Sequence, residues 1–391
     1  MSQSGATREW SLLVAACACV GPSSKADRIR ELCRGALDWK TVIGLADRHG
    51  VLPLLGQALA QQEASIPPDA LGALNEGRQA NTIKSLLVAR ELIRILDHLK
   101  QRNLDVIPYK GPVLAQLAYG DIALRKSGDI DLLIRASQFR AVCSAATELG
   151  FTPHLHLSSV EEKAYLQSGY EYSFDGAAGP NLLEVQWAIQ PRFYSVAFDV
   201  EGLFDRAIEI EVAGQPMKTL STEDLILVLS VHAAKHVWGR LVWLSDIARL
   251  ASCLSVDWNW TAAQASKLGA SRIMQVTFLL CSQLLEPAAY SEIANYFPSD
   301  EKSSMLADEL QNHLLSQSEY NVDSLAYFRL MLSLRERIAD RVRFVQRLLL
   351  TPGPGEWQVV SLPSALFPLY RVIRLARVSA RLARACSTPL R

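Results

Sequence analysis

The sequence predicts an α+β protein in which a small mixed sheet is flanked by helical regions on both sides. Apolar residues recur at helical intervals in residues 7–100 and again beyond Thr222, whereas strand and helix patterns alternate between them. A chain of 391 residues has room for two or three domains. We therefore expect an N-terminal helical region at 1–103, a mixed domain at 104–215 and a C-terminal helical region at 216–391.

The composition is that of a soluble globular protein, with 49% hydrophobic and 20% charged residues. Lys+Arg and Asp+Glu balance at 40 each, so no global field gathers nucleic acid or acidic partners. The seven cysteines lack metal-ligand spacing, which suits reduced thiols in the cytoplasm. The early run "SLLVAACACVGPSS" lacks the basic flank of a signal peptide and is interpreted as a buried helix. We expect no transmembrane segment.

The N-terminal region is predicted to be helical throughout. "DWKTVIGLADRHGVLPLLGQALA" spaces its apolar residues as a helix does, with a break at Gly-Val and Leu-Pro. "NTIKSLLVARELIRILDHLKQRN" is typical of a long amphipathic helix that ends at Asn103. Its expected apolar stripe consists of Leu86, Leu87, Leu92, Ile93, Ile95 and Leu96.

The middle region is predicted to follow a β-α-β-α-β-β order. "LDVIPYKG" is the first strand, and Pro112 opens the helix after it. "GDIDLLI" is the second strand, followed by a helix that stops at Gly150. Two further strands are expected at "EYSFDG" and "NLLEVQWAI".

Helices are predicted again in the last part of the chain. The first covers "TEDLILVLSVHAAKHVWGRLVWLSDIARLASCL", and others lie near 260–285, 287–297 and 324–350. "TPGPGEW" interrupts the pattern, and a basic helix ends the chain.

Two aspartates inside the second strand are the first sign of function. Asp129 and Asp131 are two residues apart, so on an extended chain they project to the same face. Like charges this close raise each other's pKa unless a cation compensates, and Mg²⁺ or Mn²⁺ is the usual solution. Alternatively, Asp129 caps a turn and Asp131 faces solvent.

Phosphate-binding features lie close to this pair. Lys110 and Gly111 precede a helix whose N-terminus offers free N–H groups and a positive dipole end. Arg125 adds a second cation, and we include Gly128, the residue before Asp129, among the expected phosphate-binding residues. This grouping is what phosphoryl or nucleotidyl transfer needs.

A third carboxylate is expected on a neighbouring strand. "NLLEVQWAI" supplies Glu184 among apolar residues, which suits a third metal ligand or a general base. The alternative is a solvent-facing glutamate on an edge strand.

The segment "YKGPVLAQLAYGDIALRKSGDIDLLI" resembles the core motif of the bacterial uncharacterised nucleotidyltransferase family, which belongs to the DNA polymerase β-like nucleotidyltransferase superfamily. A Lys-Gly turn, an Arg and an Asp-x-Asp strand recur there in this order. The resemblance extends to "LLEVQWAI" and "HAAKHVWGRLVWLSDIARL", and to the final "W…LP…LY…R". The wider superfamily has Gly-Ser where this chain has Lys110-Gly111, and the family's His before Trp is replaced by Gln186.

The resemblance implies a transferase that moves a nucleoside monophosphate from an NTP, with ATP expected, to a small molecule, peptide or protein. Asp129 and Asp131 would hold Mg²⁺, and Glu184 would complete a second metal position or act as the base. Lys110, Arg125 and the amides at Gly111 would neutralise the phosphates. Two alternatives stay open. One is a catalytically weakened nucleotide-binding or regulatory module, and the other is a tRNA- or nucleic-acid-modifying nucleotidyltransferase.

Two further features carry expectations. His232 and His236 are four residues apart on one helix, but Ala233 replaces the glutamate of a zinc protease and no third ligand is evident, so zinc is not expected. The resemblance places His232, His236 and Trp238 near the cleft, with a structural role equally open.

Arginines form a stripe along the last predicted helix, from Arg371 to Arg384, and no acidic residue follows Glu356. We favour a surface helix whose arginines pair with acidic groups elsewhere. An anionic membrane surface or a polyanionic partner at the Arg371–Arg384 stripe is the alternative.

Overall fold

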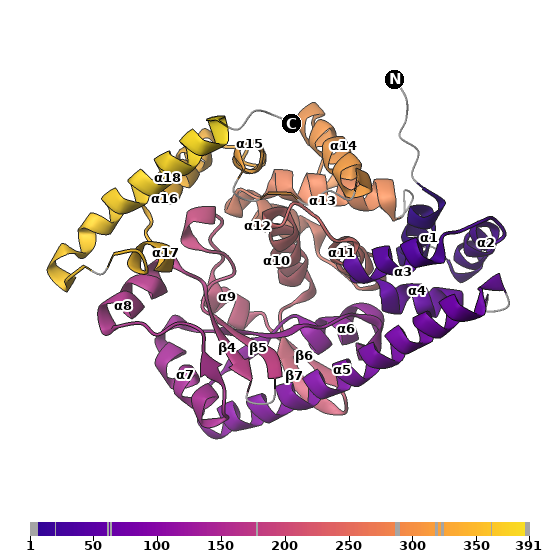
Figure 1. Cartoon of the computed structure of the whole chain (residues 1–391), viewed down its shortest axis with the longest axis horizontal. Coiled ribbons are helices and arrows are strands. Elements are labelled where there is room, and N and C mark those ends of the chain that lie inside the picture. The colour runs from indigo at the N-terminus through magenta and orange to yellow at the C-terminus, as the bar shows by residue number, and fades with distance from the viewer. Residues whose placement is uncertain are drawn as a thin grey trace.

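The computed structural model has the predicted fold class: it is mostly helical, with a five-stranded mixed sheet in the middle (Figure 1). Among the residues that it describes, no helix is long and apolar enough to cross a membrane. The described residues are 7–19, 21–60, 62, 65–176, 179–285, 290–316, 320–321, 324–360 and 362–387.

The sheet follows the predicted order of elements with one addition. The structure inserts a short strand and a helix, β3 and α8 (Ser159–Ser168), before the two strands expected last. Only the β2–β5 pair is parallel, and the other pairs are antiparallel. In spatial order the strands are β1 (Val106–Pro108), β2 (Asp129–Ile134), β5 (Gly179–Gln186), β4 (Glu171–Gly176) and β3 (Thr152–Pro153).

Two helices, α5 (Pro68–Gln101) and α7 (Phe139–Glu148), cover one face of the sheet. Alternation along β2 sends Ile130, Leu132 and Ile134 to this face, where they join a buried cluster with the C-terminal half of α5. The opposite face of β2 therefore carries Asp129 and Asp131.

The stripe predicted on α5 is partly wrong. Leu86 and Leu87 are 54% and 55% exposed, whereas Leu92 and Ile95 are buried. The buried face repeats at Val88, Leu92, Ile95 and Leu99, at spacings of four, three and four residues. Because a helical residue turns by about 100°, Leu86 points away from that face and Leu87 lies beside it.

The N-terminal helices form a compact group against α5 and α11. The early apolar run is α1 (Arg8–Cys17), most of which is buried, as expected for a core helix. It packs against α2, α3 and α4, and it also reaches α11. The other helices of the group are α2 (Pro22–Cys33), α3 (Trp39–Arg48) and α4 (Leu52–Leu59).

A β-hairpin that the sequence did not predict follows α9 (Val200–Asp205). Its strands are β6 (Ile208–Val212) and β7 (Gln215–Thr219). Ala213 and Gly214 form the turn with φ of 50° and 76°, the conformation of tight hairpin turns. The alternating sequence IEIEV was the missed signal. The proposed division between residues 215 and 216 falls within β7.

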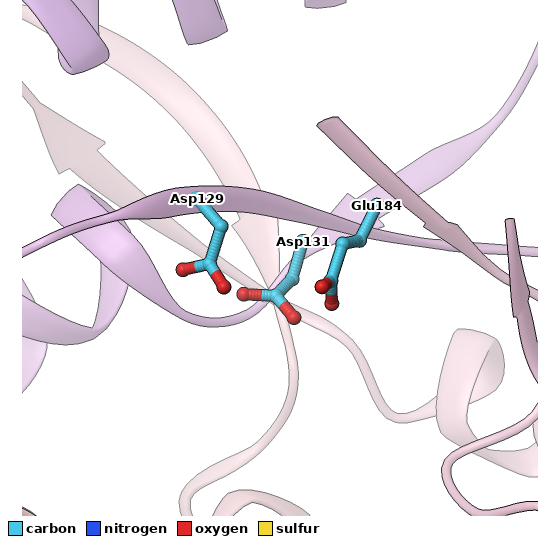
Figure 2. Close-up of side chains that lie close together, drawn as sticks. All are labelled: Asp129, Asp131 and Glu184. Atoms are coloured by element: carbon cyan, nitrogen blue, oxygen red, sulfur yellow. The ribbon is translucent and has the colours of Figure 1, made fainter. Parts of the chain in front are cut away.

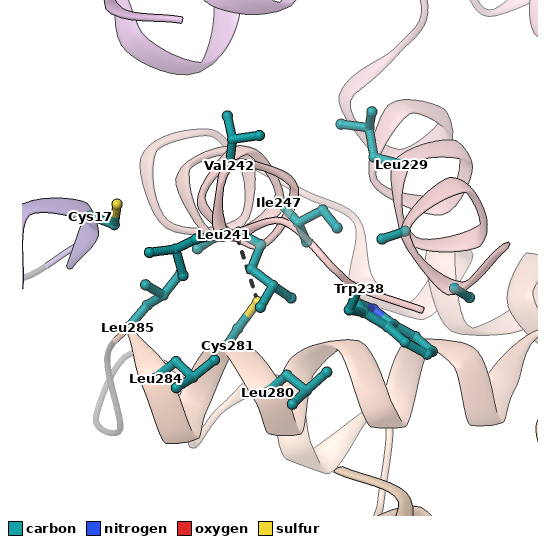
Figure 3. Packing of buried hydrophobic residues seen from close by; sticks show 14 of the residues in the cluster. Cys17, Leu229, Trp238, Leu241, Val242, Ile247, Leu280, Cys281, Leu284 and Leu285 are labelled. Carbon is teal, nitrogen blue, oxygen red and sulfur yellow. Dashed lines mark hydrogen bonds between the residues drawn. The ribbon is translucent and has the colours of Figure 1, made fainter. Parts of the chain in front are cut away.

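A second core joins the N-terminal helices to α10–α16 of the C-terminal region, and Trp238, Leu241, Ile247 and Cys281 pack together within it (Figure 3). The Cys281 thiol donates to the Leu244 carbonyl oxygen at 3.7 Å. The helices of the C-terminal region are α10 (Thr222–Lys235), α11 (Leu241–Cys253), α12 (Trp258–Leu268), α13 (Ser271–Leu284), α14 (Glu301–Ser316), α15 (Leu325–Ser333), α16 (Ile338–Leu350), α17 (Pro354–Trp357) and α18 (Tyr370–Ser387).

Two predictions for this region extend beyond the described residues. The helix expected at 287–297 reaches residues 287–289, which lie outside the described residues. In the rest of that range the structure has the 3₁₀ turn η5 (Ile293–Asn295). The arginines of α18 do pair in part: Arg374 and Arg377 bind the buried Glu356. The side chains of Arg381 and Arg384 lie outside those that the structure describes.

Candidate active site

Strand register brings three carboxylates together on the face of the sheet opposite α5 and α7. Asp131 pairs with Glu184 across the parallel β2–β5 ladder, and Asp129 lies two residues earlier on β2. Oxygen atoms of the three side chains lie within 4.8 Å of one another. All three point to the same side, as Figure 2 shows. Asp131 is only 2% exposed, so the alternative in which it faces solvent is wrong.

This cluster holds unfavourable negative charge. Burial and then the charge of Asp131 raise the pKa of Asp129, and the same two causes raise the pKa of Glu184. One oxygen of Asp131, Oδ2, is buried and has no hydrogen-bond partner among the residues that the structure describes. Because a buried carboxylate oxygen needs a donor or a cation, this atom is suited to a metal ion.

Lys110 supplies part of the compensation. Its Nζ lies 2.8 Å from Asp131 Oδ1. Burial, the largest single cause, would lower the pKa of Lys110, but the charges of Asp131, Tyr109 and Asp129 and the hydrogen bond to Asp131 together raise it. Lys110 is therefore a cation held at the carboxylates, and its predicted role in phosphate binding stays a prediction.

Gly111 fixes the approach of a helix to this cluster. It is the first residue of α6 (Gly111–Tyr119) and has a φ of 58°, which favours glycine. A Cβ at this position would lie 3.4 Å from the Asp129 carbonyl oxygen. The positive end of α6 therefore lies beside β2, where a phosphate could meet it. Gly128 is exposed and precedes Asp129 directly.

Gln186 links the carboxylates, and sequence analysis missed this role. Its Nε2 donates to Asp131 Oδ1 at 2.9 Å and to Glu184 Oε2 at 3.0 Å. Its Oε1 accepts a hydrogen bond from the Tyr109 hydroxyl. Gln186 lies two residues after Glu184 on β5, so the shared face was a signal that could have found it. Its amide donates to both carboxylates without carrying a charge.

Arg125 forms a buried ion pair with Asp246, and its charge also acts to lower the pKa of Asp129. Its Nε donates to Asp246 Oδ2 at 3.0 Å, and the Tyr119 hydroxyl donates to Asp246 Oδ1 at 2.8 Å. Both members of this ion pair are buried. The structure therefore places Arg125 in a connection from the start of β2 to α11.

A cavity of about 370 Å³ opens onto the carboxylates. One wall comes from the sheet and the other from α10 and α11, so the site lies between the middle and C-terminal regions. The lining includes Lys110, Asp129, Tyr170, Glu171, Glu184, Gln186, His232, Lys235, His236, Arg240 and Trp243.

The two histidines line this cavity, as the resemblance implied. Their rings lie 4.7 Å apart and both contact Trp243. Burial and neighbouring cations lower both pKa values, that of His236 to about 4, so both imidazoles are neutral at pH 7. No cluster of three metal ligands among the described residues includes them.

Trp238 does not line the cavity. It is fully buried, and its Nε1 donates to Thr277 Oγ1 at 3.0 Å. Val237 and Trp238 have φ of 57° and 49°, and this turn after α10 carries the indole into the core. Trp243, five residues further on, is the tryptophan at the cavity.

Lys235 at the end of α10 and Tyr170 directly before β4 form a pair that joins the two walls of the cavity. Lys235 Nζ donates to the Tyr170 hydroxyl at 2.9 Å, and burial lowers the pKa of Lys235 to about 8. Tyr170, Glu171 and Arg240 were not predicted, because their place at the site depends on how distant elements pack.

Carboxylates on adjacent strands, a lysine beside them and a helix N-terminus aimed at the same point define a site of the nucleotidyl-transfer class. The carboxylates and the unpartnered Asp131 oxygen also fit a divalent cation. The model of the uncharacterised nucleotidyltransferase family matches residues 35–286, and the chain belongs to this family.

Two solved structures are also similar. One is the lincosamide antibiotic adenylyltransferase LnuA bound to lincomycin, at 16% identity and a TM-score of 0.32, covering 42% of this chain and 97% of that one. The other is the antibiotic-resistance factor ANT(2'')-Ia, at 15% identity and a TM-score of 0.29, covering 59% of this chain and 95% of that one. No curated protein matches the chain.

Proposed function

We propose that the protein is a Mg²⁺- or Mn²⁺-dependent enzyme that transfers a nucleoside monophosphate from an NTP, with ATP expected, to an acceptor. The acceptor is a small molecule, a peptide or a protein. The observation that carries the proposal is the buried carboxylate of Asp131, which lies beside those of Asp129 and Glu184. Its Oδ2 has no hydrogen-bond partner among the described residues and is therefore free to bind a metal ion. The cytoplasmic location expected from the cysteine pattern stays a prediction.

The reaction forms a bond between an acceptor oxygen and the α-phosphorus. The bond from the α-phosphorus to the bridging oxygen breaks, and pyrophosphate leaves with that electron pair. Asp129, Asp131 and Glu184 would hold the metal ion. When bound, the ion supplies positive charge to the triphosphate oxygens.

The proton of the acceptor must go to a base. Glu184 is suited to this task where it does not bind metal, because its raised pKa brings it closer to neutral pH. Gln186 holds the Glu184 carboxylate through Nε2, so the oxygen that accepts the proton has a fixed position.

Several residues would bind the phosphates. Lys110 and the first turn of α6 lie beside the carboxylates, and Lys235 and Arg240 add cations to the cavity wall. We propose Gly128 as a backbone contact because it is exposed directly before Asp129. Arg125 would act as a positioning residue, because it binds Asp246 of α11.

Specific contacts bear on the two alternative functions, a catalytically weakened module and a tRNA-modifying enzyme. Gln186, which replaces the family's histidine, keeps both carboxylates hydrogen-bonded, so its presence does not favour a catalytically weakened module over an enzyme. A tRNA-modifying role would use the arginines of α18, but Arg374 and Arg377 already bind Glu356. Transfer to a smaller acceptor is therefore the better supported proposal.

The test is Asp131→Asn in the full-length protein, incubated with each α-labelled NTP, Mg²⁺ and a metabolite extract as the acceptor pool. We expect metal-dependent label transfer and pyrophosphate release by the natural sequence, and loss of both in the variant. The matched control is Asp97→Asn, which makes the same chemical change at an exposed position of α5. Normal turnover by Asp131→Asn contradicts the proposed roles. No transfer by the natural sequence favours the inert module.

A further inference from the structure

A second and larger cavity lies where the C-terminal helices meet the middle region. Its volume is about 710 Å³, within the range of small-molecule sites. Its walls come from α8, the 3₁₀ turn η4 (Arg192–Tyr194), α16, η6 (Ser364–Leu369) and the start of α18. These elements are far apart in the sequence but lie together in the fold. Nothing in the proposed transfer reaction uses this cavity.

Three arginines line the cavity, and no carboxylate of the described residues does. They are Arg192 on η4, Arg347 on α16 and Arg371 on α18. Arg192 Nη1 donates to the Gln167 carbonyl oxygen at 3.5 Å, and Arg347 Nη1 donates to the Arg192 carbonyl oxygen at 3.3 Å. Within the described part of the chain, none of these three forms an ion pair with an acidic side chain.

Other arginines of α18 do form ion pairs, so the absence of acidic partners is confined to the arginines at the cavity. Arg374 and Arg377 lie on the same helix and bind the buried Glu356, with Arg377 Nη1 at 2.7 Å from Oε1. The arginine stripe therefore divides, and Arg371 faces the cavity. Burial, followed by the charges of Arg192 and Arg343, lowers the pKa of Arg347. The three arginines therefore place positive charge in this cavity, and no acidic side chain of the described residues neutralises it.

We infer that this arginine cavity binds a small organic anion that carries phosphate or carboxylate groups. Guanidinium groups bind such anions through paired, charge-assisted hydrogen bonds. Thr351 and the side chain of Gln167 add neutral polar groups to the lining, while Phe367 offers an apolar ring to the remainder of the ligand.

Two short chain segments contribute residues to the linings of both the arginine cavity and the candidate active site. Ser168 lines the first and Tyr170 the second, and an extended chain spans at most about 7 Å over two residues. Arg192 and Ile189, three residues apart, are divided between the cavities in the same way. The anion is therefore either a group of the acceptor or a separate regulatory ligand, and the experiment distinguishes the two.

The test is calorimetric titration of the full-length protein with inorganic phosphate at constant ionic strength, without NTP or Mg²⁺. We expect Arg371→Gln to raise the dissociation constant roughly tenfold, the effect of one charge-assisted hydrogen bond. Arg347→Gln should act in the same direction. Arg371 is exposed and makes no hydrogen bond to the described residues, so Arg371→Gln should fold normally.

A control separates this cavity from other cationic positions. Arg329→Gln removes the same charge from an exposed position of α15 and should bind phosphate as the natural sequence does. Unchanged binding in both cavity variants, or an equal loss of binding in Arg329→Gln, overturns the inference.

A second measurement adds phosphate to the transfer assay. Inhibition that more acceptor extract reverses identifies an anionic group of the acceptor. A changed maximal rate that the extract does not reverse identifies a regulatory ligand, and both results support the arginine cavity. The titration needs no catalysis, so it tests the arginine cavity even if the protein shows no nucleotidyl transfer.

Discussion

Replacing Asp129 with asparagine should stabilise the metal-free protein and remove its response to Mg²⁺. The carboxylate lies within 4.8 Å of those of Asp131 and Glu184, and no described cation neutralises it directly. Asparagine has the same shape but no charge. A substitution at the centre of the proposed site is therefore expected to strengthen the fold while it abolishes function.

The magnitude follows from the distance between the charges. Two unit charges 4.8 Å apart repel by about 3.5 kcal/mol at an effective dielectric constant of about 20. Lys110, Arg125 and partial protonation offset part of this repulsion, so we expect a gain of about 1.5 kcal/mol in the free energy of unfolding. At about 2.1 cal/mol/K per residue, the unfolding entropy of 391 residues converts this gain to a rise in Tm of about 2 °C.

The pH dependence of the stability gained by Asp129→Asn gives a second check. Burial and then Asp131 raise the pKa of Asp129, so the folded protein holds this proton more tightly than the unfolded chain. The stabilising contribution of the protonated group is lost as pH rises through the folded pKa. Asp129→Asn should therefore stabilise most above that pKa, and the gain should disappear in acid.

The assay is scanning calorimetry in chelator and in millimolar Mg²⁺. The natural sequence should gain stability with Mg²⁺ according to its affinity, whereas Asp129→Asn should not. Asp97→Asn, on the exposed surface of α5, should leave both values unchanged. The reasoning fails if Asp129→Asn melts no higher than the natural sequence in chelator and keeps its full response to Mg²⁺.

Four further substitutions test other parts of the structure. His49 is buried and its pKa is lowered from 6.5 to about 4. Relative to His49→Gln, the natural sequence should therefore lose on the order of 3 kcal/mol of unfolding free energy between pH 6.5 and pH 4, measured by denaturant titration. Glu356→Gln should cost about 1–2 kcal/mol, because its arginine partners are partly exposed, and should speed hydrogen exchange in α18. Gly111→Ala should cost about 1–2 kcal/mol through its φ of 58° and also weaken NTP binding, whereas Gly120→Ala, at a φ of 71° with open space, should cost only stability.

Local periodicity was enough to predict the parts of the site that lie close in sequence. The spacing of Asp129 and Asp131 determines a shared face, and Pro112 after Gly111 determines where a helix begins. Both inferences use distances of one or two residues, over which backbone geometry leaves few choices. The carboxylate pair and the helix that approaches it could therefore be predicted from the residues alone.

The rest of the site depends on register and on packing between distant elements. Glu184 lies opposite Asp131 only because β2 and β5 pair in parallel at that register. Arg125 could not be assigned to Asp246 from the sequence, because 121 residues separate them. Positive φ values at Val237 and Trp238 decided which tryptophan reaches the cavity, and no spacing rule predicts them.

Because the middle and C-terminal regions both line the candidate active site, the middle region cannot carry a complete site by itself. The strands belong to the middle region, but His232, Lys235 and Trp243 arrive from helices that follow it. A fragment cut to residues 104–215 would keep its acidic ligands yet leave their side of the sheet bare to water. Such a piece would expose apolar groups such as Ile189, so shuffling it into another protein would require a new cover as well as a new acceptor pocket.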